Sequence, residues 1–458
     1  MAQKISIFWH RRDLRLHDNA GAYHALQGEH PVLPLFIFDW NILHQLEDPE
    51  DARVSFLHEE IRHLDATLQD MGSALLVRYG KPEKVWSELL EAYDIAAVYT
   101  NRDYEPYAKQ RDEQIRKLLA QRDIPFLTFK DQVIFEEMEI TKKDGGAYTV
   151  FTPYSRRWRE KMQSEIRTIT DADGQQQDMS AFLAPYDNKA YYDRYWTTDP
   201  FPMPSLAEMG FRPSSVPIPS REVPRKIIKN YDKTRNFPGV QGTSRLGIHF
   251  RFGTISIRQK AARARLLNEA YLNELIWRDF YAQILANFPR VVEQSFRPEY
   301  DYIAWRNNED EFAAWCAGQT GYPMVDAGMR ELNTTGYMHN RVRMITASFL
   351  TKHLLIDWRW GEAYFAAKLL DYELSSNNGG WQWAAGSGTD AAPYFRIFNP
   401  ASQLKKFDPD LTYVKKWVPE YDTDAYPEPI VDHKAARERC LETYKAGLDK
   451  GRKALGKA

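Results

Sequence analysis

The spacing of apolar residues changes along the chain, and this change limits the folds open to it. In the first 130 residues, short runs rich in β-branched and aromatic residues alternate with stretches whose apolar residues recur every three or four positions. We expect strands at 5–9, 32–38, 74–79, 96–99 and 126–129, separated by helices such as 54–71 and 108–121. Strands that alternate with helices form right-handed βαβ units, so this part predicts a doubly wound parallel sheet of Rossmann-like topology.

The rest of the chain follows a different pattern. Between 131 and 203 the periodicity fades and breaker residues such as Gly145 and Gly146 become frequent, which is typical of a long connection. From 204 onward apolar residues recur at helical spacing, for example at 254–290 and 310–353. The sequence therefore predicts an α/β plus all-α protein, with an α/β domain at 1–130, an interdomain linker at 131–203 and an all-helical domain at 204–458.

Composition narrows the class of protein. The 458 residues include 61 Lys and Arg against 63 Asp and Glu, and this net charge of −2 argues at first against nucleic acid as a partner. Only Cys316 and Cys440 occur, which excludes a disulfide framework and a cysteine metal site, and the 11 His show no metal-ligand spacing. No apolar run is long enough to span a membrane and the N-terminus has no signal-peptide pattern, so we expect a cytoplasmic protein.

One segment departs from this balance of charge. Residues 221–265 hold twelve Lys or Arg and only two acidic residues, for a local charge of +10. The simple interpretation is a solvated helix face, and the functional one is a surface that binds phosphates. Within it, Thr243, Ser244 and Arg245 precede a helical run, so the hydroxyls either cap that helix or, with the guanidinium, bind a diphosphate.

Three later motifs carry side chains suited to a flat ligand. Glu274, Trp277 and Arg278 share one helix face, either as a surface ion pair beside a core tryptophan or as a carboxylate beside an aromatic platform. The amide of Asn340 can pair with a base or flavin edge, although a lone asparagine is more often structural. Residues 377–383 combine two Asn, two Gly and two Trp, which fits a backbone pressed against a planar ring system.

These motifs resemble those of a known family. The segments 8–15, 243–246, 273–278, 335–344 and 377–400 are similar to those of the photolyase/cryptochrome family, and most similar to class I cyclobutane pyrimidine dimer (CPD) photolyases. The resemblance extends over nearly the whole chain. It implies an N-terminal α/β domain, a wrapping linker and a C-terminal helical domain that binds FAD in a bent conformation, with the reduced, anionic flavin as the active form.

The resemblance also implies which residues hold the flavin. Arg343 and Asp371 match the charge pair beside the isoalloxazine, and Asn377 matches the position that faces flavin N5. Gly247 stands where the family often has a serine that contacts the cofactor. The residues that match positions around the phosphates and the flavin are Tyr231, Thr243, Ser244, Arg245, Leu246, Tyr271, Glu274, Arg278, Tyr337, Asn340, Arg343, Asp371, Glu373 and Asn377.

Light-driven electron transfer to damaged DNA is the activity that the resemblance implies. The excited flavin would donate an electron to a pyrimidine dimer flipped out of the duplex, the cyclobutane bonds would open, and the electron would return. Trp277 and Trp383 would flank the dimer, Glu274 would hydrogen-bond it, and Asn340 and Met344 would contact its bases. The residues assigned to DNA binding are Arg235, Trp277, Arg341, Trp383 and Lys405.

Three more tryptophans match a functional set of the family. Trp381, Trp358 and Trp305 occupy the positions of the chain along which an electron hops between the flavin and the surface. Each of them taken alone would be interpreted as a core aromatic residue. As a matched set they predict a path for photoreduction.

An antenna chromophore in the α/β domain is a further expectation. Folate-binding members carry Asn-Glu at the positions of Tyr107 and Ala108, so the resemblance favours a deazaflavin or flavin antenna over folate. Where deazaflavin-type members have lysine, this chain has arginine, which keeps the charge and changes the geometry. The residues that match this pocket are Asp103, Glu105, Arg111 and Arg251.

Two related activities stay open. A cryptochrome-type photoreceptor is disfavoured by Asn377, since plant-type cryptochromes place Asp there. A (6-4) photoproduct photolyase is disfavoured too, because those enzymes use two histidines at the positions where this chain has Asn340 and Met344. A non-enzymatic nucleic-acid binder would not need the motif at 377–383. We expect a monomer that acts on damaged DNA, with no obligate protein partner, membrane attachment or metal.

Overall fold

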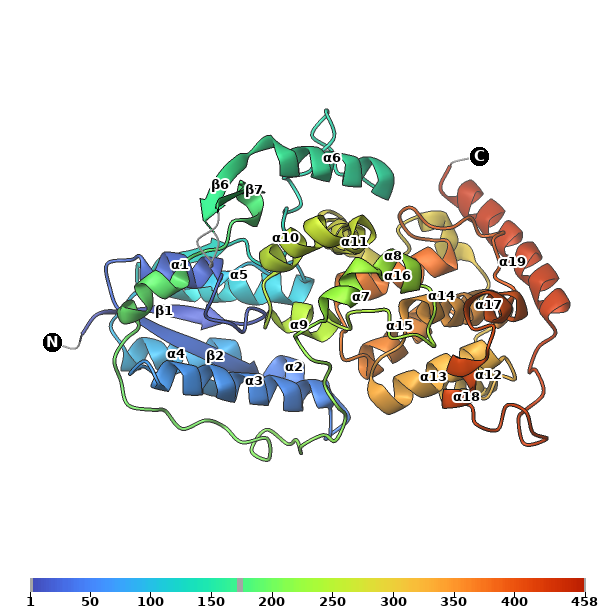
Figure 1. The fold of residues 1–458 in the computed structure, drawn as a ribbon, viewed down its shortest axis with the longest axis horizontal. Coiled ribbons are helices and arrows are strands. Elements are labelled where there is room, and N and C mark those ends of the chain that lie inside the picture. Colours follow the sequence, from blue (N-terminus) through green and yellow to red (C-terminus); the bar gives the residue numbers. More distant parts are fainter. Residues whose placement is uncertain (1–2, 171–175, 457–458) are drawn as a thin grey trace. The chain divides into compact units, whose positions relative to one another are not determined.

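The structure of this protein is a computed structural model that describes residues 3–170 and 176–456 (Figure 1). Contacts between residues divide the chain into two compact units. Unit 1 comprises Met1–Glu139, Trp158–Arg221 and Leu246–Leu266. Unit 2 comprises Ile140–Arg157, Glu222–Arg245 and Leu267–Ala458. Each unit is therefore assembled from three separate pieces of the chain, and the basic stretch 221–265 contributes to both.

Unit 1 is built around a parallel sheet of five strands in the order β3-β2-β1-β4-β5. The strands are β1 (Ile5–His10), β2 (Val32–Asp39), β3 (Leu76–Gly80), β4 (Ile95–Asn101) and β5 (Phe126–Phe129). Each predicted strand is confirmed to within two residues. The chain first builds outward from β1 to β3 and then returns to place β4 on the other side of β1. The carboxyl ends of β1 and β4 thus form a topological switch point, where open parallel sheets bind ligands.

Helices cover both faces of this sheet. The helices α1 (Ala20–Leu26) and α3 (Ala52–Gln69) enclose one core, to which β1 contributes Phe8. The helices α4 (Pro82–Ala92) and α5 (Pro106–Ala120) enclose the other core, to which β1 contributes Ile7 and Trp9. Successive residues of β1 therefore enter opposite cores and all are buried, which explains why this strand is apolar on both sides.

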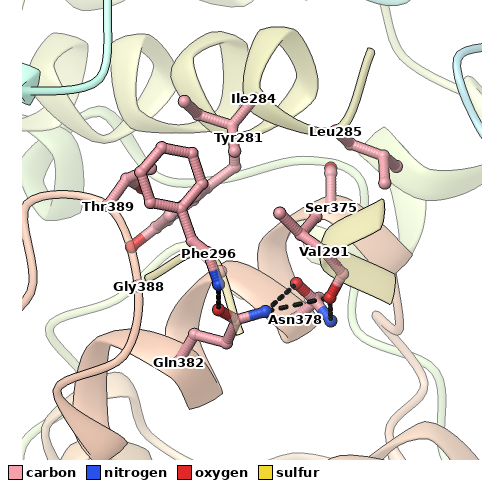
Figure 2. A pocket seen from close by; sticks show the side chains of 11 residues that line it. Tyr281, Ile284, Leu285, Val291, Phe296, Ser375, Asn378, Gln382, Gly388 and Thr389 are labelled. Atoms are coloured by element: carbon pink, nitrogen blue, oxygen red, sulfur yellow. Dashed lines mark hydrogen bonds between the residues drawn. The ribbon is translucent and has the colours of Figure 1, made fainter. Parts of the chain in front are cut away.

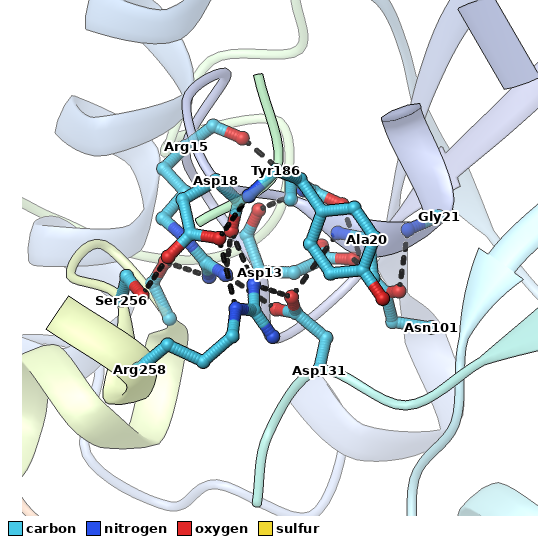
Figure 3. Close-up of polar contacts among 12 residues, drawn as sticks. Asp13, Arg15, Asp18, Ala20, Gly21, Asn101, Asp131, Tyr186, Ser256 and Arg258 are labelled. Carbon is cyan, nitrogen blue, oxygen red and sulfur yellow. Dashed lines mark hydrogen bonds and ion pairs between the residues drawn. The ribbon is translucent and has the colours of Figure 1, made fainter. Parts of the chain in front are cut away.

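A buried polar network joins the loops of unit 1 (Figure 3). The carboxylate of Asp131 lies 2.7 Å from Arg15 and 2.8 Å from Arg258, and Arg258 also reaches Asp18 at 2.8 Å. Burial raises the pKa of the Asp131 carboxyl, but the two guanidinium groups outweigh this effect and hold the pKa below its usual range. Because a buried charge left unpaired is strongly destabilising, the network ties Arg258 in α10 (Ile257–Leu267) firmly to the N-terminal loops.

Unit 2 contains α-helices, with short 3-10 segments between some of them, and no strand among its described residues. Its central helices, α11 and α16, pack against each other. A π-helical turn, Phe349–His353, follows α14. The α-helices of this unit are α7 (Arg225–Lys229), α8 (Tyr231–Thr234), α11 (Glu269–Asn287), α12 (Glu309–Ala317), α13 (Pro323–Thr335), α14 (Asn340–Ser348), α15 (Trp358–Lys368), α16 (Leu374–Ala385), α17 (Pro400–Phe407), α18 (Thr412–Trp417) and α19 (His433–Ala454).

The segment predicted as a structureless connection contains regular structure. Helix α6 (Phe151–Ser164) begins in unit 2 and ends in unit 1, and the antiparallel strands β6 (Ile166–Thr170) and β7 (Gln176–Ser180) follow it. The buried face of α6 carries Phe151, Tyr154, Trp158 and Met162, at helical spacing. This spacing was a usable signal, although the breaker residues on either side of the helix diluted it. None of the described helices is long and apolar enough to cross a membrane.

Candidate functional site

Hydroxyl groups and aromatic rings from three parts of unit 2 meet in one cluster. The hydroxyls of Thr243 and Tyr337 lie 3.1 Å apart, and the hydroxyl of Tyr271 donates to Ser244 Oγ at 3.0 Å. The rings of Tyr231 and Tyr271 meet edge to face with centroids 5.1 Å apart. The structure thus brings together five residues predicted to surround the same ligand, although they span about a hundred positions in the sequence.

The two hydroxyls do not cap a helix, so that interpretation of the sequence was wrong. Helix α9 (Gly247–Phe252) starts three residues after Ser244, and Leu246, which precedes it, makes no side-chain capping bond. Leu246 is itself buried in unit 1. The intervening Arg245 has a positive φ of 52°, which turns the chain before the helix can begin. The hydroxyls are consequently directed at tyrosines instead of helical N–H groups.

Ion pairs hold the guanidinium groups of this site in place. Arg343 donates to Met338 O at 2.7 Å and lies 2.9 Å from Asp371 Oδ2, as the resemblance implied. Arg278 lies 2.9 Å from Glu373. The second oxygen of the Asp371 carboxylate is buried and has no hydrogen-bond partner among the described residues. A buried acceptor of this kind requires a donor, so a ligand with an N–H or O–H group fits here.

The buried imidazole of His339 lies in a region of strongly positive charge. It is 3% exposed and precedes α14, where its Nδ1 accepts a hydrogen bond from Arg341 N at 3.1 Å. Burial lowers the pKa of His339, and the charges of four arginines lower it further, to about 4. Those arginines are Arg343, Arg341, Arg245 and Arg235. Cations converging on one buried point suit an anionic ligand.

The amide of Asn377 is fixed by a neighbouring carboxyl group. Its Nδ2 donates to the backbone oxygen of Glu362 at 3.1 Å and to the Glu362 side chain at 2.8 Å. Burial raises the pKa of the Glu362 carboxyl, and this hydrogen bond only partly offsets the effect. Sequence reasoning missed Glu362, because it stands 15 residues away on α15 and belongs to no motif.

Glu274 and Arg278, one turn apart on α11, take different partners. The carboxylate of Glu274 lies 2.5 Å from Arg235 Nη1. Burial raises the pKa of the Glu274 carboxyl, and Arg235 lowers it in part. Arg341 donates to Asn236 Oδ1 at 2.7 Å and approaches Met344 Sδ at 3.5 Å. Among the residues predicted to bind DNA and the lesion, Arg235 thus pairs with Glu274 and Arg341 contacts Met344, while Asn340 is exposed.

The two tryptophans predicted to flank a lesion lie on the two central helices. Trp277 on α11 is half-buried, and the ring of Phe151 stacks flat on it with centroids 3.7 Å apart and an interplanar angle of 3°. Tyr281, one turn later on α11, lies 5.4 Å from Trp277. Trp383 on α16 is half-buried and packs against the main core of unit 2. Sequence reasoning missed Phe151 and Tyr281.

Hydrogen bonds among residues that line a small pocket next to Tyr281 fix α16 in place (Figure 2). Gln382 accepts a bond from Phe296 N at 2.7 Å and donates to Val291 O at 2.9 Å. Asn378 also donates to Val291 O, at 3.0 Å. These side-chain amides are saturated by the protein itself, so their role is to fix the helix that carries Asn377, Trp381 and Trp383.

The predicted hopping tryptophans run from the core toward the surface. Trp381 and Trp358 are 2% and 1% exposed in the main core of unit 2, and Trp305 is half-buried at its edge. Gly361 on α15 allows the Trp381 ring to approach the helix backbone, because a Cβ there would lie 2.1 Å from it. Trp305, the only partly exposed member of the three, suits the end of an electron path at the solvent boundary.

Three of the four residues assigned to an antenna pocket meet at the switch point of the sheet in unit 1. Arg12, which follows β1, lies 3.1 Å from both Asp103 and Glu105, which follow β4. Arg251 pairs with Glu105. Burial raises the pKa of the Asp103 carboxyl, but Arg12 and Arg251 outweigh burial and hold the pKa well below its usual range. Sequence reasoning missed Arg12, which completes this group.

The fourth residue, Arg111, is drawn into a neighbouring group. It lies 3.1 Å from Asp112 and 3.6 Å from Asp39, whose carboxylate also accepts a bond from Tyr107 at 2.7 Å. Burial raises the pKa of Asp39, and the Tyr107 hydroxyl and Arg111 offset this in part. The two groups together give this edge of the sheet a preformed array of charged side chains.

The basic stretch 221–265 is less available to phosphates than its local charge suggested. Five of its twelve basic residues are arginines paired with carboxylates. The acidic partners come from distant positions, which is why counting charges along the stretch could not reveal them. The pairs are Arg221 with Glu60, Arg235 with Glu274, Arg245 with Glu331, Arg251 with Glu105, and Arg258 with Asp18 and Asp131.

The remaining predicted residue, Lys405, is exposed on α17. Among the described residues, no group of three or more His, Cys, Asp and Glu side chains is arranged to hold a metal ion. The chemistry available to unit 2 is therefore that of hydroxyls, amides, guanidinium groups and aromatic rings. Such a set suits a large ligand that is both aromatic and phosphorylated.

Comparison with known proteins agrees with this chemistry. Residues 6–172 match the family model described as DNA photolyase. Residues 271–424 match the model described as the FAD binding domain of DNA photolyase. The deoxyribodipyrimidine photo-lyase of Halobacterium salinarum is 36% identical over 96% of this chain and 98% of its own length. The enzyme of the same name from Escherichia coli is 35% identical over 96% and 98%.

Solved structures show the same architecture. A class III photolyase from Agrobacterium tumefaciens has a TM-score of 0.80 at 30% identity and covers 98% of both chains. An archaeal photolyase from Sulfolobus tokodaii, solved with two FAD molecules, has a TM-score of 0.77 at 34% identity and covers 96% of this chain and 99% of its own. A parallel-sheet unit, a helical FAD-binding unit and full-length similarity at this level show that the chain belongs to the DNA photolyase family.

Proposed function

We propose that this protein repairs cyclobutane pyrimidine dimers in DNA under blue light. The observation that carries the proposal is the grouping of Trp277, Glu274, Arg235 and Arg341 on one part of unit 2. An aromatic face, a half-buried carboxyl and two guanidinium groups match the needs of a flat lesion with flanking phosphates. The relatives named deoxyribodipyrimidine photo-lyase support this assignment.

FAD is the cofactor that the residues of unit 2 fit. Thr243, Ser244, Arg245, Tyr231 and Tyr271 would hold its diphosphate, since hydroxyls and a guanidinium complement phosphate oxygens. Glu274 and Asn340 would line its flavin from the side of the lesion. The other residues that would line the flavin are Arg278, Tyr337, Arg343, Asp371, Glu373 and Asn377. When bound in its reduced, anionic form, FAD supplies light-driven one-electron transfer to the dimer.

The protein side chains would bind and polarise the lesion. Trp277 and Trp383 would stack on the extruded dimer and compensate for the stacking that it loses in the duplex. Glu274, whose pKa is raised by burial and lowered in part by Arg235, would hydrogen-bond the lesion and favour the extra electron density on a base carbonyl. Asn340 and Met344 would contact the bases, and Arg235, Arg341 and Lys405 would bind the neighbouring phosphates.

The tryptophans Trp381, Trp358 and Trp305 are proposed to connect the cofactor with solvent. Each can be oxidised, and Trp305 is partly exposed while Trp381 and Trp358 are buried, so together they would carry an electron inward when the cofactor has to be reduced. Their role would be to prepare the enzyme and not to split the dimer.

A second chromophore is proposed for the switch point in unit 1. Arg12, Asp103, Glu105 and Arg251 surround that point, and Arg111 lies in the adjoining group. The relative from Sulfolobus tokodaii was solved with two FAD molecules, which supports a flavin-type antenna over a folate. Extraction of the purified protein and identification of its chromophores test this proposal. Only one flavin per chain and no second pigment would contradict it.

Repair in light and dark tests the proposed function directly. The reduced protein is mixed with an oligonucleotide that carries one CPD, and the dimer content is measured with and without blue light. We expect loss of the dimer only under illumination, by a protein that acts as a monomer. Equal dimer content in light and dark would overturn the proposal. A (6-4) photoproduct in the same assay separates the two lesion classes, and light-induced signalling without repair would indicate a cryptochrome.

A further inference from the structure

The ring of Phe151 covers one whole face of Trp277. The two rings are parallel to within 3°, with centroids 3.7 Å apart. Phe280 meets both rings edge-on, at 5.7 Å from Phe151 and 5.6 Å from Trp277. The indole is therefore confined on one face and along one edge. A planar ligand that stacks on Trp277 has only the opposite face to use.

The segment that carries Phe151 is anchored on both sides of this contact. Gln283 of α11 donates to Tyr148 O at 2.8 Å, and the ring of Tyr154 packs 5.2 Å from Phe280. These contacts place residues 148–154 along α11, and this segment is called the strap below. The strap belongs to unit 2 together with α11 and α16.

The same segment also reaches the loop that follows α16. The backbone N–H of Phe151 donates to the carboxylate of Asp390. Asp390 has a positive φ of 49°, which aspartate adopts more readily than most non-glycine residues. Phe151 therefore stacks on Trp277 of α11 and is hydrogen-bonded to the loop that follows α16, the helix that carries Trp383.

We propose that Phe151 is a positioning residue for lesion recognition. It holds the indole of Trp277 in one orientation with one face covered, and its backbone N–H ties that platform to the loop that follows α16, the helix that carries Trp383. The indole is then held in its binding orientation before DNA binds. DNA binding therefore does not have to supply the free energy of ordering it. This inference rests on the proposed function, because Trp277 must stack on the extruded lesion.

Dark binding of two DNA oligonucleotides tests the proposal. Affinity of the whole protein is measured by fluorescence anisotropy for a CPD oligonucleotide and for the same oligonucleotide without damage. Stacked aromatic pairs contribute enough for Phe151→Leu to weaken CPD binding by about two- to tenfold. Undamaged DNA should bind as before, because it does not stack on Trp277. Phe151→Tyr should restore the affinity, since it keeps the flat ring.

A double-mutant cycle separates positioning from a general structural effect. In a Trp277→Leu background, Phe151→Leu should have no further effect on CPD affinity, because there is no indole left to position. Tyr148→Leu is the matched control: it removes a ring from the same strap that packs 6.4 Å from Tyr154 and not on Trp277. It should leave CPD affinity unchanged.

Several results would overturn the inference. Equal CPD affinity of Phe151→Leu and the unaltered protein would do so, as would an equal loss in Tyr148→Leu or a full additional loss in the Trp277→Leu background. Should Phe151→Leu fail to fold, Phe151→Met keeps a flexible apolar side chain of similar size and is measured in its place. Failure of the unaltered protein to repair a CPD in light, together with intact dark discrimination that depends on Phe151, would reject the proposed function alone.

Discussion

The carboxylate of Glu274 lies 2.5 Å from the guanidinium of Arg235, so the residue proposed to bond the lesion is already paired with one proposed to bond phosphate. Both side chains are about a quarter exposed, at 29% and 26%. A pair in this position can exchange partners when DNA arrives: the guanidinium can turn to a phosphate as the carboxyl turns to a base. Under the proposed function, the pair would couple lesion recognition to the binding of the DNA backbone.

Glu274→Ala should lower repair and at the same time strengthen non-specific binding. A hydrogen bond involving a charged or polarised group contributes about 1.5–3 kcal/mol, so the repair yield should fall at least about tenfold. The freed Arg235 should bind one more phosphate, and the dependence of undamaged-DNA affinity on salt should steepen by about one charge. Flavin absorbance should stay the same as in the unaltered protein. Loss of the flavin would show that Glu274 serves mainly to hold the cofactor.

Trp381→Phe should prevent photoreduction and spare repair. Phenylalanine fills most of the same space in the core, but it is much harder to oxidise than tryptophan. Illumination of the oxidised protein with an external reductant should therefore leave flavin absorbance unchanged, while chemically reduced protein repairs a CPD normally. The matched control is Trp360→Phe. It alters a half-buried tryptophan that lies on α15 and outside the proposed path. Loss of repair by the reduced Trp381→Phe protein would contradict the proposed role.

Gly361→Ala should destabilise unit 2. The added Cβ would lie 2.1 Å from the ring of Trp381, and overpacking of a core typically costs about 1–3 kcal/mol. Gly380→Ala is a suitable control, because a Cβ at this exposed position of α16 meets nothing within 4 Å. That change should stabilise the protein by about 0.4–1 kcal/mol, since alanine restricts the unfolded chain. The stability of both variants is measured by urea unfolding. Equal unfolding midpoints would show that the ring of Trp381 moves aside at little cost.

Replacing His339 should flatten the pH dependence of stability. The pKa of this histidine is about 4 in the folded protein, against 6.5 for the ordinary group. The unfolded chain therefore binds more protons between these values, and the free energy of unfolding should rise as the pH increases from about 4 to 6.5. His339→Asn keeps a capping side chain and removes this titration.

The comparison is made by urea unfolding at pH 5 and pH 8. The unaltered protein should lose stability on the order of 2 kcal/mol more than His339→Asn when the pH is lowered. His353, whose pKa is lowered to about 3 by burial and by neighbouring cations, titrates in both proteins and cancels in the difference. Identical pH profiles would mean that the buried imidazole is not the group that senses pH here.

Local pattern was sufficient for most elements of this fold. The β-rich run 5–9 predicted the strand β1, and helical spacing predicted a helix that carries Glu274 and Trp277, which is α11. Helix α6 was missed although Phe151, Tyr154 and Trp158 follow the same spacing, because breaker residues surround it. Short-range periodicity is a property of neighbouring residues, so the sequence carries it without the fold.

Partners that come from distant positions were decided only by the tertiary structure. The sequence marks Arg258 as part of a basic stretch, but folding buries it against Asp18 and Asp131 and removes it from any phosphate surface. It marks Trp277 as an aromatic platform, but only packing shows that Phe151 covers one of its faces. Charge pairing and ring stacking depend on distance in space, and a chain folded from interleaved pieces sets those distances independently of position in the sequence.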